Sequence, residues 1–94
     1  MGRVRKGRDI DSALCKKGFR KEIDGRHILY SLMGSVKIHT MMSHGMFGDT
    51  VGTPLISQMA RQLRLTKNQF LNLIDCTVSE KDYRAILRNQ GEAV

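Results

Sequence analysis

Cysteine and histidine are both scarce in this chain, and neither is arranged as a metal site. The two cysteines, Cys15 and Cys76, form no Cys-x-x-Cys pair and no cluster with histidine. A disulfide framework or a structural zinc site needs such clusters, so we interpret both cysteines as reduced, small core residues. His39 and His44 have poor spacing for metal ligands, and Asp49 is the carboxylate nearest to them in the sequence. We therefore predict no metal and no cofactor.

Long hydrophobic runs are absent as well. The chain has no apolar run long enough for a membrane-spanning helix, which needs about 18 residues or more. Residues 1–8 are mostly charged, so they do not resemble the apolar region of a signal peptide. We expect a soluble cytoplasmic protein with no membrane partner. The 94 residues contain no internal repeat and predict one domain, which can bury roughly 60–70% of its unfolded surface.

Positive charge is absent from one part of the chain and concentrated in another. Residues 38–60 contain no lysine or arginine, whereas residues 1–26 carry nine against four acidic residues, within a net charge of +7. The basic half is the candidate surface for a polyanion, although a charged N-terminus also serves solubility alone. Residues 1–8 are expected to form a flexible basic arm. Residues 9–91 are expected to form the domain, with a helical extension from about residue 79.

Two glycine-containing turns divide residues 18–44 into short segments that alternate apolar and polar residues. This alternation predicts strands at about 19–23, 27–32 and 36–42. With a three-residue second turn at 33–35, Tyr30 and Leu32 share one face of the sheet with Ile38 and Thr40. The opposite face then carries His27, Leu29, Ser31, Lys37, His39 and Met41.

Helix signals flank the predicted strands on both sides. Before them, residues 10–14 have helical apolar spacing. After them, Pro54 indicates a helix start, residues 66–69 form a capping box, and Ser79 caps a last helix. The expected order is α-β-β-β-α-α-α, an α+β fold with helices on one face of a three-stranded antiparallel sheet. The first five elements, α-β-β-β-α, have the layout of double-stranded-RNA-binding domains, and the remaining helices are additions at the C-terminus.

Several short motifs follow one another along residues 17–70. They are Lys17-Gly18-Phe19, Gly25-Arg26-His27, Ser43-His44, Gly52-Thr53-Pro54-Leu55, Gln62-Leu63-Arg64-Leu65-Thr66 and Phe70. This series resembles the HicA (YcfA-like) toxins of bacterial and archaeal toxin–antitoxin modules, over about residues 10–75. Arg26 stands where the family typically has serine, and the chain continues past the family's usual end with one more helix.

The resemblance to HicA toxins implies a ribosome-independent mRNA endonuclease with a fold like that of double-stranded-RNA-binding domains. It also implies that the histidine at the start of the second strand is catalytic and that a HicB antitoxin silences the enzyme. On this chain the catalytic histidine would be His27, and the histidine at the exit of the third strand would be His44.

His27 also suits this role on chemical grounds. Metal-free RNA cleavage needs a base for the 2′-hydroxyl and an acid for the leaving 5′-oxygen, and imidazole can supply either near neutral pH. The plainer interpretation is a polar residue that flanks a turn, and His44 suits ordering of a loop at least as well as catalysis. We expect the substrate-binding residues to be Arg20, Lys21, Gly25, Arg26, Lys37 and His44.

Three other functions stay open on the sequence alone. The same fold can bind RNA without cleaving it. Residues 56–74 also have the rhythm of a DNA-binding helix-turn-helix, with Lys67, Asn68, Gln69 and Asn72 as readers. The third possible function is that of a small partner-binding protein whose basic arm serves only solubility. Methionines suit adaptable binding surfaces, so Met41, Met42, Met46 and Phe47 are candidates for contact with an antitoxin.

Overall fold

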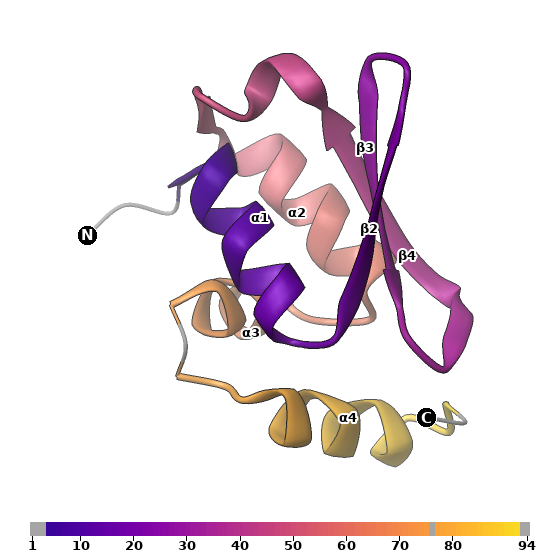
Figure 1. The fold of residues 1–94 in the computed structure, drawn as a ribbon. Coiled ribbons are helices and arrows are strands. Elements are labelled where there is room, and N and C mark those ends of the chain that lie inside the picture. The colour runs from indigo at the N-terminus through magenta and orange to yellow at the C-terminus, as the bar shows by residue number, and fades with distance from the viewer. Residues whose placement is uncertain (1–3, 76, 93–94) are drawn as a thin grey trace.

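The computed structural model describes residues 4–75 and 77–92, and these form an α+β fold around a three-stranded antiparallel sheet (Figure 1). In chain order the elements are β1 (Arg5–Lys6), α1 (Gly7–Lys16), β2 (Phe19–Asp24), β3 (His27–Leu32), β4 (Ser35–Ser43), a 3-10 helix (His44–Met46), β5 (Thr50–Val51), α2 (Thr53–Gln62), α3 (Lys67–Ile74) and α4 (Glu80–Asn89). The sheet has the strand order β2-β3-β4, and the short strands β1 and β5 form a separate antiparallel pair.

A two-residue loop fixes the register between β2 and β3. Asp24 pairs directly with His27, so that Gly25 and Arg26 form the whole loop. Gly25 has a φ of +62°. Glycine adopts this backbone conformation without strain, and two-residue hairpin loops of type II′ require it at their first position. The loop therefore presents Arg26 immediately before the first residue of β3.

The second hairpin reaches the expected arrangement of faces by a different route. Leu32 pairs with Ser35, which leaves a loop of two residues rather than the expected three. The pairing also shifts between Ser31 and Leu32, whose partners are His39 and Ser35, so three residues of β4 lie opposite none of β3. The inward face consequently carries Ile28, Tyr30, Leu32, Ile38, Thr40 and Met42, all of them buried. The predicted division of the two faces is confirmed.

Helices α1 and α2 lie on one side of the sheet and enclose the core (Figure 1). Buried apolar side chains from both helices meet the inward face of the strands, and the apolar face of α3 completes this core. Two hydrogen bonds tie the layers together. The Tyr30 hydroxyl donates to Asp11 on α1 at 2.6 Å, and the Thr40 hydroxyl donates to Gln62 on α2 at 2.6 Å. These bonds satisfy polar groups that would otherwise be costly to bury.

Helix α4 packs into the core. Tyr83 and Leu87 are fully buried, the Tyr83 ring stacks on Phe19 with centroids 5.8 Å apart, and its hydroxyl donates to the Leu63 carbonyl at 2.9 Å. The approach is close: a Cβ added at Gly18 would lie 2.5 Å from a Glu80 carboxylate oxygen. Helix α4, which lies beyond the segment that resembles HicA toxins, is therefore an integral part of this domain.

The N-terminal region is more ordered than expected. Residues 5 and 6 form β1, which pairs with β5. Helix α1 begins at Gly7, within the segment 1–8 that was expected to be a flexible arm. The pairing of β1 with β5 also structures part of the segment between β4 and α2. Cys15, expected in the core, lies on the exposed side of α1. The part of its side chain that is buried loses contact with water, which raises the pKa of the thiol. Cys76 and residues 1–3 lie outside the described residues.

The tyrosines predict how stability depends on pH. The chain has two tyrosines, Tyr30 and Tyr83, and burial raises the pKa of both hydroxyls, aided at Tyr30 by the hydrogen bond to Asp11. Unfolded tyrosine has a pKa of about 10, so the stability contributed by the neutral hydroxyls is intact below that pH and falls above it. We expect tyrosinate absorbance to rise in one cooperative step, together with loss of far-ultraviolet circular dichroism. Gradual ionisation near pH 10 of a still folded protein would contradict the buried placement.

Candidate functional site

The outward side of the sheet, called the open face below, carries polar and basic side chains. Strand alternation places ten residues on it, and each of them is exposed or half-buried. Helices α1 and α2 cover the opposite side (Figure 1). The ten residues of the open face are Arg20, Glu22, Asp24, His27, Leu29, Ser31, Lys37, His39, Met41 and Ser43.

The structure brings His27, Gly25, Arg26 and His44 together at one end of the open face. His27 pairs with Ser43 on β4, so His44 follows immediately beyond this row. The backbone N–H of His44 donates to the carbonyl of Arg26 at 2.6 Å. Two histidines that are far apart in the sequence therefore begin from adjacent backbone positions, and Arg26 lies between them.

The loop beside His27 is open to an incoming molecule. Arg26 and His27 are both exposed, and a Cβ placed on Gly25 would meet no atom within 4 Å. A phosphate can thus approach the backbone of the loop as well as the Arg26 guanidinium. Guanidinium groups bind phosphate oxygens through two parallel hydrogen bonds, which fixes orientation as well as charge.

Arg20 and Lys37 lie on the open face but at its other end. Arg20 pairs with Ser31, which in turn pairs with His39, and Lys37 is two positions before His39 on β4. Ser31 is four residues along β3 from His27, a separation of about 13 Å at the rise of an extended strand. These two cations therefore lie too far from His27 to share one small ligand with it.

Lys21 does not belong to this surface. Its side chain lies on the helical side of β2, where its ammonium group forms an ion pair with Asp11 at 3.0 Å and lies 5.4 Å from the centroid of the Phe47 ring. The alternation of β2 already places residue 21 on the same face as Phe19. Its expected role as a substrate contact does not fit this geometry.

Charge on the open face is divided between its strands. The two carboxylates, Glu22 and Asp24, both come from β2, whereas β4 contributes none. A polyanion would be repelled along the β2 side and tolerated along β3 and β4. The favourable path for a phosphate chain runs from His27 along β4 toward Lys37.

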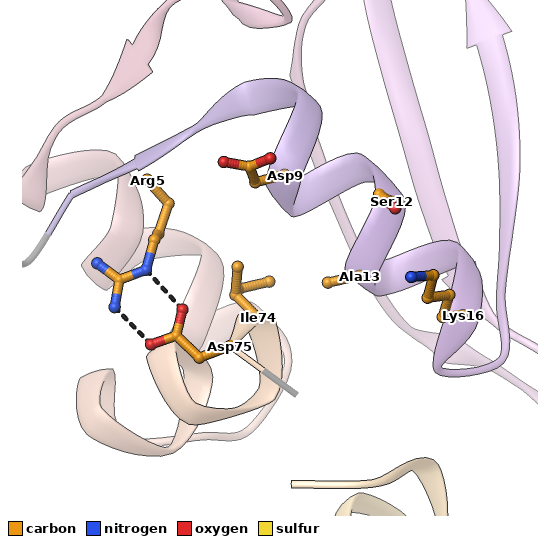
Figure 2. A pocket seen from close by; sticks show the side chains of 7 residues that line it. All are labelled: Arg5, Asp9, Ser12, Ala13, Lys16, Ile74 and Asp75. Carbon is orange, nitrogen blue, oxygen red and sulfur yellow. Dashed lines mark hydrogen bonds and ion pairs between the residues drawn. The ribbon is translucent and has the colours of Figure 1, made fainter. Parts of the chain in front are cut away.

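A small pocket of about 230 Å³ lies on the helical side, between α1 and the end of α3 (Figure 2). Arg5 and Asp75 meet there through two hydrogen bonds of 2.8 and 2.6 Å, which lower the pKa of Asp75 and raise that of Arg5. The pair ties β1 to the end of α3. Sequence reasoning gave no sign of it, because the two residues are 70 positions apart. We assign this pocket a structural role.

The helix-turn-helix interpretation fits the structure poorly. Half of the eight-residue helix α3 is buried. Gln69, one of the expected base readers, instead accepts a hydrogen bond from the Thr66 N–H at 2.9 Å and closes the capping box that the sequence predicted. A recognition helix needs several side chains free to reach base edges. Lys67 is the sole cation of α3.

Comparison with protein-family models, curated proteins and solved structures yields no match for this chain. Within the described residues, no three side chains of histidine, cysteine, aspartate or glutamate converge as metal ligands. The same part of the chain contains no helix with the length and apolar character needed to span a membrane.

Proposed function

We propose that this protein is a HicA-like mRNA endonuclease that works without a metal ion and uses His27 for proton transfer. The observation that carries the proposal is that His27, Arg26 and His44 occupy adjacent backbone positions at one exposed end of the sheet. The element order α1-β2-β3-β4-α2, with the helices behind the sheet, supports a fold like that of double-stranded-RNA-binding domains. Because the substrate is mRNA, the protein would act in the cytoplasm.

The proposed reaction is transfer of a phosphoryl group within the RNA strand. His27 removes the proton of a 2′-hydroxyl, whose oxygen forms a bond to the adjacent phosphorus. The bond from phosphorus to the 5′-oxygen breaks, and a proton is delivered to that oxygen. The products are a 2′,3′-cyclic phosphate and a 5′-hydroxyl. No water or oxidant is consumed in this step.

The neighbours of His27 supply the remaining functions of the site. Arg26 holds the reacting phosphate, since a guanidinium neutralises the charge that grows on its oxygens. His44 is the second imidazole at this end and serves either to protonate the leaving oxygen or to orient the strand. The pH dependence of kcat separates these two roles, because loss of a general acid removes one limb of a bell-shaped profile.

A HicB-type antitoxin would act by covering the open face. Of the four residues expected to form an apolar contact, Met42 is buried and Met46 and Phe47 pack against the core. Met41 is 46% exposed and lies beside Leu29 in the middle of the open face. A partner bound at this point would block access to His27 while burying an exposed methionine.

Induced expression in cells tests the proposal. We expect the wild-type protein to arrest growth and deplete cellular mRNA, whereas His27→Ala does neither at equal soluble levels. Intact mRNA with both proteins, alongside RNA binding by both, would instead indicate an RNA-binding module without catalysis. Equal mRNA loss with both proteins would show that cleavage does not depend on His27.

A further inference from the structure

A second basic surface lies on α4, outside the site described above. Lys81, Arg84 and Arg88 are spaced so that they fall on one side of the helix. Together with Ser79 and Glu80 they line a shallow groove of about 490 Å³. Glu80 is the acidic residue of this lining, and its carboxylate is already paired with the Arg84 guanidinium at 2.9 Å. The groove therefore presents a surplus of positive charge.

Contacts with the core and with one loop hold the groove against the end of the sheet. Arg84 donates to the carbonyl of Met33, in the loop between β3 and β4, at 3.0 Å. The buried ring of Tyr83 and its bond to Leu63 fix the rest of the helix. Figure 1 shows α4 running below the end of the sheet where this loop lies. The next basic residue along the chain from that loop is Lys37, on the open face.

We propose that the α4 groove binds phosphates of the same RNA strand that His27 cleaves, an inference that rests on the proposed function. The strand would leave the His27 end, follow β4 past Lys37 and reach Lys81 and Arg88. Charge complementarity supports this path, because β4 carries no carboxylate and the groove's carboxylate is neutralised by Arg84. Lysine and arginine without an ordered arrangement of aromatic rings fit the phosphate backbone rather than particular bases.

The location of the groove determines what it contributes. The length of β3, from His27 to Leu32, is about 16 Å at the rise of an extended strand. The groove lies beyond that end, so it cannot touch the reacting phosphate. It therefore strengthens binding of long RNA and leaves both kcat and the binding of short RNA unchanged.

Binding measurements on the catalytically silent His27→Ala protein test this inference. RNAs of about 4 and about 16 nucleotides, the range of site sizes of single-stranded binding domains, separate the two ends of the path. Adding Lys81→Gln and Arg88→Gln should weaken binding of the long RNA only. Its dependence of log K on log salt should become shallower by about 1.4, or 0.7 for each lost phosphate contact. Both substituted side chains are exposed, so the thermal unfolding midpoint should change little.

A matched control removes the same amount of charge from the opposite layer. Arg8→Gln with Lys16→Gln changes two exposed cations on α1, behind the sheet. Equal weakening by this pair would indicate a general effect of net charge and overturn the inference. Unchanged binding of long RNA by the α4 variant would also overturn the inference. That result is expected if the groove instead binds an acidic protein segment. If the parent protein binds neither RNA, the proposed function itself fails, and the inference about α4 fails with it.

Discussion

Replacing His27 with alanine is expected to lower kcat for RNA cleavage by about 10²–10⁴-fold, the usual contribution of one positioned proton-transfer group. The side chain is exposed at the first position of β3, so its removal should leave the fold intact. On the proposed mechanism, its loss would remove the base that activates the 2′-hydroxyl, while Arg26 and the rest of the open face would still bind the strand. We therefore expect KM to change much less than kcat. Single-turnover cleavage of a defined RNA, with saturating enzyme, measures the chemical step directly.

His39 provides the matched control for this experiment. It lies on the same open face and is also exposed, but it pairs with Ser31 at the far end of the sheet. His39→Ala should keep the wild-type kcat. A comparable loss of kcat in both variants would place the chemistry elsewhere or indicate that histidine removal disturbs the whole face.

Replacing Tyr83 with alanine is expected to reduce the free energy of unfolding by about 3–5 kcal/mol, as for other large aromatic residues in a core. Tyr83 is fully buried, stacks on Phe19 and donates its hydroxyl to the Leu63 carbonyl. The substitution therefore opens a cavity between α4 and the sheet and leaves a buried carbonyl unpaired. Domains of this size are stable by only about 5–15 kcal/mol, so partial unfolding at physiological temperature is expected.

Tyr83→Phe separates the two parts of this effect. It keeps the ring and the stacking on Phe19 but removes the hydroxyl, which should cost about 1–3 kcal/mol for the buried carbonyl left without its partner. Equilibrium denaturation by urea measures both values. If Tyr83→Ala costs no more than Tyr83→Phe, the ring contributes nothing and α4 does not form part of the core.

Local sequence signals predicted most of the fold because each has a local physical cause. Glycine at residues 25 and 34 marks the hairpin loops, and the capping boxes that begin at Thr66 and Ser79 satisfy backbone donors within four residues. The pairing of β1 with β5 was missed because two-residue strands have no periodicity to recognise. The shift in pairing in the second hairpin was missed for a related reason: it inserts three residues of β4 without changing which faces the strands present.

The parts of the candidate site that depend on strand register were predictable from the sequence. The parts that depend on how side chains and helices pack in three dimensions were not. Alternation placed His27 on the exposed side, and pairing with Ser43 brings His44 to the same end. Lys21 was included among the substrate contacts because it is close to them in sequence, whereas the structure places it on the inward face, where Asp11 pairs with it. The cations of α4 were detectable from their spacing at residues 81, 84 and 88. Their relation to the sheet depends on tertiary packing that the sequence does not reveal.

Incubation of the purified protein with a defined RNA in the presence of a metal chelator tests the central claim most directly. We expect the wild-type protein to produce fragments ending in a 2′,3′-cyclic phosphate and a 5′-hydroxyl, and His27→Ala to produce them at a rate near background. Binding of the RNA without such fragments would contradict the claim of catalysis. Cleavage that occurs only with a divalent metal, or that leaves a 5′-phosphate, would contradict the proposed role of His27.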